Sequence, residues 1–302
     1  MIVSVSRRCD IPRFSFDWFL ERLNEGFAEV KNPFNPRQTR RVSLLPPAPG
    51  RLPDESAEVF AFWTRDPAFI LKHADELETR GYGFYVMITL TSYPAILEPN
   101  VPPPEAVIQT MRSLAQKITP DRVIWRYDPV FLSDVTDFEF HRENFSGLAA
   151  RLKGAVNRVI VSIYDEYLTA EKRLAALEQG GFLKRMPLYE SGPAGTKSLL
   201  PAVRGLLAEL ACIAGASGME IQSCAEEGLS DSPQSGSCGI RQGACIDGEY
   251  IARHFGQKAP SLANIGKDQG QKRPNCLCAK SVDIGSYGPC PASCVYCYAL
   301  HP

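Results

Sequence analysis

Short apolar runs alternate with amphipathic segments from the start of the chain to about residue 223. The runs are rich in Val, Ile, Phe, Tyr and Trp, as buried parallel strands usually are. They predict strands over Ile2–Ser6, Phe27–Lys31, Val59–Trp63, Phe84–Leu90, Val123–Tyr127, Val159–Tyr164 and Met219–Ser223. Between them, apolar residues at helical spacing predict helices over Phe16–Gly26, Ala68–Gly81, Pro104–Ile118, Phe138–Val156, Thr169–Gly180 and Leu199–Ala214.

This repeated alternation of strand and helix is typical of a parallel sheet covered by helices. It predicts an α/β fold, most simply a TIM-barrel-like (β/α) barrel, complete or partial, over residues 1–228. An open doubly wound sheet is the alternative.

Polar and ionisable residues follow directly after most of the predicted strands. In α/β barrels the carboxyl ends of the strands carry the active site, so these residues are candidates for catalysis. The arginines among them either neutralise neighbouring aspartates or hold a carboxylate or phosphate of the ligand in fork geometry. The candidates are Arg7, Arg8, Asp10, Arg65, Arg126 and Asp128.

The character of the chain changes after about residue 228. Residues 228–243 are rich in Gly, Ser, Gln and Pro, which is typical of loops, and a short helix is predicted around Tyr250–Phe255. A segment with little regular pattern but many cysteines is better ordered by metal than by a core of its own. We therefore expect residues 229–302 to form an irregular Cys-rich cap that binds metal and packs on the mouth of the barrel.

Composition and the lack of certain motifs exclude several classes of protein. The chain has 302 residues, 44% hydrophobic and 22% charged, and its net charge of −1 lacks the basic excess of a bulk nucleic-acid binder. No stretch approaches eighteen apolar residues, and the first residues form no secretory signal, so we expect a cytoplasmic protein without membrane contact. No dinucleotide, Walker or nucleophile-elbow motif is present in the sequence.

Eight of the ten cysteines lie after residue 223. The last three, Cys290, Cys294 and Cys297, have the spacing C-x3-C-x2-C, which suits three corners of an iron–sulfur cube with the fourth iron open. Structural zinc completed by Cys276 or Cys278, unlinked thiols and disulfides are the alternatives. In a reducing compartment, clustered thiols more often bind metal than pair with each other.

A second group of cysteines consists of Cys276 and Cys278, only two residues apart, with Cys224 and Cys245. Either these four form a second metal centre, or they are small buried hydrophobic residues. We expect Cys9 and Cys212 to be ordinary core cysteines. The four histidines occur in no metal-binding motif and are expected to be surface or core residues.

The motif Cys290-x3-Cys294-x-Tyr296-Cys297 resembles the signature of radical S-adenosylmethionine enzymes, and Tyr296-Cys297-Tyr298-Ala299 resembles members related to spore photoproduct lyase. The whole chain is also similar to an uncharacterised bacterial family, domain of unknown function 1848. The segments that carry this second resemblance are Ser4–Arg8, Asp10–Pro12, Trp125–Pro129, Cys245–Asp247, Lys267–Gln269, Cys276–Cys278, Ser281–Gly285 and Tyr296–Ala299.

The resemblance to radical S-adenosylmethionine enzymes implies a four-iron four-sulfur cluster on Cys290, Cys294 and Cys297, with Tyr296 near the adenine of S-adenosylmethionine. In that superfamily the open iron chelates S-adenosylmethionine, and reduction yields a deoxyadenosyl radical that abstracts hydrogen. Two departures are clear. The motif lies at the carboxyl end of this chain rather than after the first strand, and no Gly-Gly-Glu element follows the second strand.

The resulting hypothesis is an iron–sulfur enzyme of radical S-adenosylmethionine type. Arg126 and the other arginines would anchor the carboxylate of S-adenosylmethionine or an anionic substrate. The substrate would be a small molecule or nucleic-acid-derived, and catalysis would need an electron donor. The alternative hypothesis is a non-catalytic zinc- or iron–sulfur-binding protein with a structural or sensing role.

Overall fold

One parallel sheet of eight strands organises the protein. The structure is a computed structural model that describes residues 1–33, 35–191, 197–226, 229, 238–256, 260–262, 265–269 and 275–301. The strands of the sheet are β1 (Ile2–Val5), β4 (Val59–Thr64), β5 (Gly83–Thr89), β6 (Val123–Val130), β7 (Arg158–Ile163), β10 (Glu220–Cys224), β11 (Arg241–Gly243) and β12 (Val282–Asp283). Their order is β11-β10-β7-β6-β5-β4-β1-β12, and every neighbouring pair is parallel.

The strands follow one another in chain order from β1 to β11, without the reversal that defines a doubly wound sheet. The predicted α/β fold with a parallel sheet is therefore confirmed. Among the described residues no pairing joins β11 to β12, so the sheet as described has two edges and is not a closed barrel.

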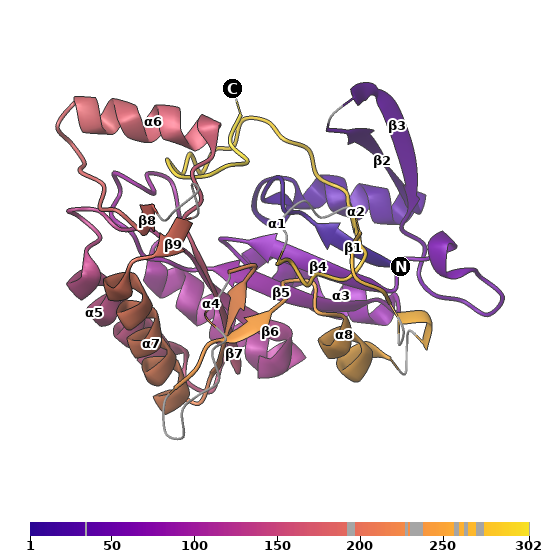
Figure 1. Ribbon diagram of the computed structural model, residues 1–302. Coiled ribbons are helices and arrows are strands. Elements are labelled where there is room, and N and C mark those ends of the chain that lie inside the picture. Colours follow the sequence, from indigo (N-terminus) through magenta and orange to yellow (C-terminus); the bar gives the residue numbers. More distant parts are fainter. Residues whose placement is uncertain are drawn as a thin grey trace.

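Helices connect the strands as the sequence predicts (Figure 1). The helix predicted over Phe138–Val156 ends at Leu152, because the chain turns at Gly154, whose φ of 78° lies in the left-handed region. The short helix predicted near Tyr250 is present and is capped by Asp247. The helices are α1 (Ile11–Phe14), α2 (Phe16–Glu25), α3 (Ala68–Thr79), α4 (Pro104–Ile118), α5 (Phe138–Leu152), α6 (Leu168–Gln179), α7 (Pro201–Ala216) and α8 (Gly248–Phe255), with 3-10 turns at Pro53–Glu55, Pro120–Arg122 and Pro260–Leu262.

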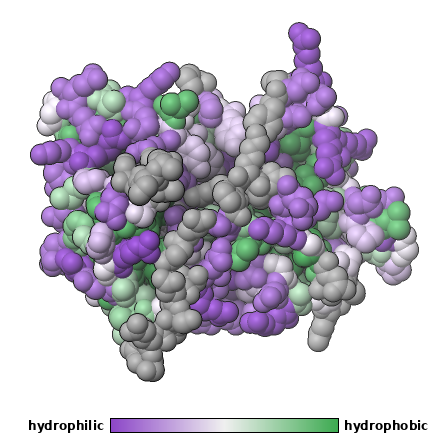
Figure 2. Space-filling view, viewed as in Figure 1, coloured by the Kyte–Doolittle hydropathy of each residue, from purple (hydrophilic) through white to green (hydrophobic). Residues whose placement is uncertain are grey.

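The prediction that Phe27–Lys31 belongs to the main sheet is wrong. β2 (Phe27–Asn32) pairs with β3 (Asn35–Ser43) in an antiparallel hairpin that stands apart from the sheet at the upper right of Figure 1. Polar residues alternate with buried Ala28, so this strand has one apolar face, whereas a strand of a covered parallel sheet needs two. The hairpin is strongly hydrophilic in Figure 2. A second small hairpin joins β8 (Tyr189–Ser191) to β9 (Lys197–Leu199).

Both faces of the main sheet are buried, by different parts of the chain. On β4, Phe60 and Phe62 belong to the core cluster formed with the helices α2 to α7. Val59, Ala61 and Trp63 point to the opposite face, where they pack against residues 244–255, Leu262 and residues 276–279. Residues after position 229 thus supply one wall of the core as well as strands β11 and β12.

Cys212 is bonded to Cys238 in a disulfide, so the expectation that Cys212 is an ordinary core cysteine is wrong. The pair joins α7 to the run that leads into β11. No helix in the described part of the chain is long and apolar enough to cross a membrane.

Candidate functional site

The carboxyl ends of the strands meet the C-terminal segment, which we define as residues 275–301. This segment contributes β12 beside β1 and then passes towards α6 (Figure 1, yellow). The candidate residues predicted after β1, β4 and β6 all lie along this edge. Asp10 and Arg65 lie near the group of Cys290, Cys294 and Cys297. Arg7 and Arg126 lie near the other group, which includes Cys245.

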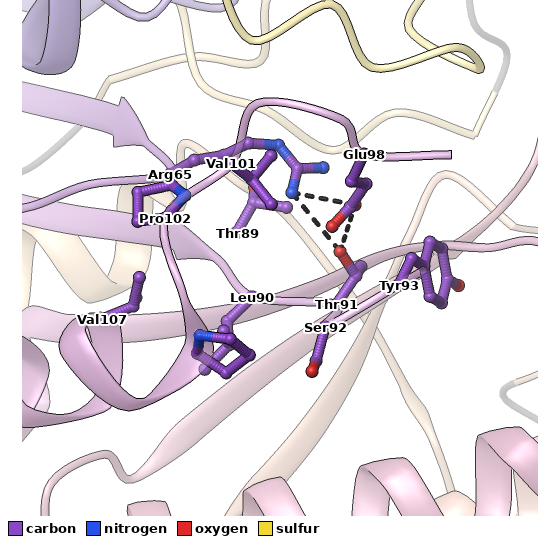
Figure 3. Close-up of a pocket in the computed structure, with 11 residues that line it drawn as sticks. Arg65, Thr89, Leu90, Thr91, Ser92, Tyr93, Glu98, Val101, Pro102 and Val107 are labelled. Carbon is purple, nitrogen blue, oxygen red and sulfur yellow. Dashed lines mark hydrogen bonds and ion pairs between the residues drawn. The ribbon is translucent and has the colours of Figure 1, made fainter. Parts of the chain in front are cut away.

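A buried polar triad anchors the C-terminal segment above β4 and β5. The Arg65 guanidinium lies 2.9 Å from Glu98 Oε1 and donates to the Tyr296 hydroxyl at 2.5 Å. Tyr296 in turn donates to Glu98, and Thr91 donates to the same carboxylate at 2.5 Å. The Glu98 side chain is 1% exposed and that of Arg65 is 14% exposed. Figure 3 shows Arg65, Thr91 and Glu98 converging above β5.

The ring of Tyr296 is enclosed by other aromatic rings. Tyr93 meets it edge-on at a centroid distance of 5.9 Å, and Phe131 stacks on it at 6.1 Å. Arg65 and Glu98 bind the hydroxyl of Tyr296, and the two rings enclose its side chain. Tyr296 therefore fixes the loop of Cys294 and Cys297 to the sheet.

Arg173 of α6 holds the same loop from the other side. Its guanidinium donates to the carbonyl oxygens of Val295 (2.9 Å), Leu300 (3.2 Å) and Cys297. Three backbone acceptors on one planar donor fix both the position and the orientation of the loop. Tyr298 adds a contact to β1, because its hydroxyl donates to the Arg7 carbonyl at 2.8 Å.

The three cysteines of the C-x3-C-x2-C motif, which we call the thiol triplet, lie in this loop. Cys294 is buried, whereas Cys290 and Cys297 are half-buried, and all three interact electrostatically with one another. Burial raises the pKa of Cys294 to about 12, and Arg65 acts in the opposite direction. Cys290 lies within electrostatic reach of Asp10, so the triplet adjoins the exits of β1 and β4.

Asp10 has a structural task at this edge. It caps α1 by accepting from the Arg13 amide at 3.1 Å, and it also accepts from the Arg65 amide at 2.8 Å. Burial raises the pKa of this carboxyl to about 6, against the effect of those hydrogen bonds. Asp10 therefore ties the exit of β1 to the exit of β4.

Arg7 and Arg8 bind the C-terminal segment rather than open solvent. Arg7 pairs with Asp283, with 3.6 Å between Nε and Oδ2, and Arg8 donates to the Gly285 carbonyl at 3.2 Å. Asp283 is buried and also accepts from Ser4 (2.8 Å) and Ser6 (2.6 Å). These contacts lock β12 and the residues after it onto β1.

Arg126 and Asp128 lie within β6, which continues to Val130, and not after the strand as predicted. They neutralise each other at an N–O distance of 2.5 Å. The Arg126 guanidinium also lies 4.8 Å from the centre of the Trp63 ring. Its Nε is buried without a hydrogen-bond partner among the described residues. Arg65, by contrast, pairs with Glu98 and not with its neighbour Asp66.

The second group, Cys224, Cys245, Cys276 and Cys278, which we call the thiol quartet, is also brought together. Cys245 donates to Cys224 with 3.4 Å between the sulfurs, and its thiol is also hydrogen-bonded to Cys278. Interaction with Cys278 is the largest of the effects that raise the pKa of Cys276. The Cys224 contact is the largest of the effects that raise the pKa of Cys245.

Within the quartet, the sulfurs of Cys224 and Cys245 are in direct contact. In the part of the chain that the structure describes, no three His, Cys, Asp or Glu side chains are already placed as a bound metal ion would require. Ligation by either thiol group would therefore need side-chain rotation and loss of the thiol protons, which metal binding normally drives.

The cavities differ at the two ends of the sheet. A cavity of about 40 Å³, large enough for water, adjoins Arg65, Thr91 and Glu98 (Figure 3). A larger one, about 390 Å³, lies near the amino ends of β1 and β4 and is lined by Glu58 and Ser261 among others. Glu58 there is bound to Ser261 and to the amino group of Met1, so its charge is already matched.

Several residues of the site are missing from the sequence prediction. Nothing in the Pro-rich stretch around Glu98 marks it as a buried partner of Arg65, and Arg173 occupies an ordinary position of an amphipathic helix. Asp283 is different, because it stands within Ser281–Gly285, a segment that carries the family resemblance. That resemblance was the available signal for it.

The chain belongs to the family described as "Domain of unknown function (DUF1848)", which it matches over residues 2–299. This match confirms the resemblance of the whole chain to domain of unknown function 1848 and leaves the resemblance to radical S-adenosylmethionine enzymes untested. No curated protein matches the chain.

Proposed function

We propose that this protein is an iron–sulfur enzyme of radical S-adenosylmethionine type. One observation carries the proposal: the loop of the thiol triplet is fixed, through Tyr296, to the buried Arg65–Glu98 pair at the carboxyl ends of the strands. Together with the three carbonyl contacts from Arg173, this pair holds the loop and its thiols in a fixed position beside the strand exits.

The donor set of the triplet fits a four-iron four-sulfur cluster. Cys290, Cys294 and Cys297 would hold it, and three thiolates leave one iron without a protein ligand. When bound, such a cluster supplies an electron to S-adenosylmethionine. The cationic Arg65 favours the thiolate form of Cys294, which is the form that binds metal.

The remaining candidate residues would position rather than react. Tyr296 would orient the loop, and Asp10 would hold the exits of β1 and β4 together. Arg126 is the candidate for the carboxylate of S-adenosylmethionine or for an anionic substrate, because its Nε is buried without a partner among the described residues. Because Asp128 already balances the charge of Arg126, we expect Arg126 to bind its ligand through hydrogen bonds.

We further propose that the sheet is a partial (β/α) barrel whose interior is filled by residues 244–246, α8 and residues 276–279. The strand order is that of a barrel. The C-terminal segment would then act as a Cys-rich cap that excludes water from the site. The substrate would be a small molecule or derived from nucleic acid, an electron donor would be the partner, and the location would be the cytoplasm.

Anaerobic purification tests the proposal. We expect visible absorption, about four irons and four sulfides in the triplet cluster, and a Mössbauer signal that disappears in Cys294→Ala. Cys9→Ala is the matched control, because Cys9 is another half-buried thiol at the same edge. Release of 5′-deoxyadenosine on addition of dithionite and S-adenosylmethionine would then establish the reaction type.

A non-catalytic metal-binding protein is the second candidate, and the thiol quartet favours it because four thiolates can form a closed site. Protein that carries zinc alone, with no iron or sulfide, would refute the enzyme and support this candidate. A cluster that gives no 5′-deoxyadenosine would point to sensing or electron transfer.

A further inference from the structure

The thiol quartet lies where the two edges of the sheet approach each other. Cys224 is the last residue of β10, and Cys245 follows edge strand β11 by two residues. Cys276 and Cys278 precede β12, the opposite edge strand, by a few residues. Two cysteines of the quartet therefore come from the β10–β11 edge of the sheet, and two come from the segment that leads into β12 at the other edge.

Backbone hydrogen bonds already bring these two sides together. The Ala279 amide donates to the Ile246 carbonyl at 2.8 Å, and the Ile246 amide donates to the Cys278 sulfur at 3.5 Å. An amide donor on a cysteine sulfur favours the charged thiolate. Cys245, Cys276 and Cys278 are buried in the core cluster on this face of the sheet, and Cys224 packs against it.

The sulfur separation favours one metal ion over a cluster. Two thiolates on the same tetrahedral ion, each about 2.3 Å from it, are roughly 3.8 Å apart. The Cys224 and Cys245 sulfurs are 3.4 Å apart, so a small rotation would suffice. In an iron–sulfur cube each thiolate binds a different iron, which places the cysteine sulfurs much farther from one another.

Two guanidinium groups lie near the site. One divalent ion with four thiolates has a net charge of −2. Arg7 interacts electrostatically with Cys278 and Cys245, and Arg126 interacts with Cys245 and Cys224. Because Asp283 and Asp128 already pair with these arginines, they offset the negative charge only in part.

We propose that the thiol quartet binds a single thiophilic divalent ion, zinc or iron(II), that joins the β10–β11 edge to the segment leading into β12. The proposal is independent of the thiol triplet. It assigns the ion a structural task, since four protein ligands leave no open position for a substrate.

The test uses the full-length chain carrying Cys294→Ala, so that no triplet cluster contributes. We expect one tightly bound zinc or iron per chain by mass spectrometry and, after exchange with Co²⁺, the intense thiolate-to-cobalt absorption of a tetrahedral site. Adding Cys278→Ser should abolish both signals, while adding Cys9→Ala should change neither. Amide hydrogen exchange in residues 241–247 and 276–283 should be faster by at least tenfold after metal removal.

Three outcomes would overturn the proposal. The first is metal-free protein that binds no Co²⁺, and the second is unchanged metal content in Cys278→Ser. The third is a disulfide between Cys224 and Cys245 in anaerobically isolated protein. An iron–sulfur signal that persists in Cys294→Ala and disappears with Cys278→Ser would replace the single ion by a cluster. None of these outcomes decides whether the triplet holds a cluster.

Discussion

Replacing Glu98 by alanine tests whether the Arg65–Glu98 pair fixes the C-terminal segment. The variant removes the carboxylate that lies 2.9 Å from the Arg65 guanidinium and leaves Arg65 charged without this partner. Since Glu98 is 1% and Arg65 14% exposed, water cannot fully solvate the remaining charge. Breaking a pair this buried typically costs about 3–5 kcal/mol, and Tyr296 and Thr91 also lose their shared acceptor.

Urea denaturation of the wild type, Glu98→Ala, Arg65→Ala and the double variant measures the effect. We expect Glu98→Ala to lower the free energy of unfolding by about 3 kcal/mol or more. The double variant should lose less than the sum of the single variants, because it removes the unpaired charge as well. Residues 290–300 should also exchange amide hydrogens faster.

The surface pair Arg22–Glu25 provides the control, because its N–O distance of 2.6 Å is as short but Glu25 is 45% exposed. Glu25→Ala should change the free energy of unfolding by no more than about 0.5 kcal/mol. The reasoning is refuted if Glu98→Ala behaves like Glu25→Ala, or if the losses from Glu98→Ala and Arg65→Ala simply add.

Three further predictions address the same edge of the sheet and its core. Gly285→Ala should destabilise the protein by about 1–3 kcal/mol in urea, because an added Cβ would lie 2.0 Å from the Ser6 hydroxyl, whereas Gly288→Ala, with open space, should be neutral. Arg173→Ala should release the C-terminal loop, detected as faster proteolysis there, and Lys172→Ala should not; equal cleavage of both would contradict the anchor. Burial lowers the pKa of His141 from 6.5 to about 4, so the folded state binds fewer protons than the unfolded state between these values. On acidification from pH 6.5 to 4 the wild type should therefore lose up to about 3 kcal/mol more stability than His141→Gln, in which Asp10 titrates in the same way, and equal slopes would refute this.

The sequence by itself determined six strands of the main sheet, β1, β4 to β7 and β10, the helices α2 to α7 that accompany them, and the parallel direction of the sheet. Apolar runs such as Phe84–Leu90 are long and two-sided, and only a strand with both faces buried accepts such a run. The position of the candidate residues at strand exits follows from the same pattern, because parallel strands end at a common edge. Both groups of cysteines were also visible from their spacing.

Tertiary structure decided which partners those residues take. Arg65 is the direct sequence neighbour of Asp66, yet it pairs with Glu98, which lies in a loop 33 residues away in sequence. The strand Phe27–Lys31 looked like part of the sheet, but its single apolar face suits a hairpin with β3. Local pattern fixes which elements form, because that depends on neighbouring residues. The ion pairs, the thiol contacts and the unjoined edges of the sheet depend on residues distant in sequence, and only their packing brings these together.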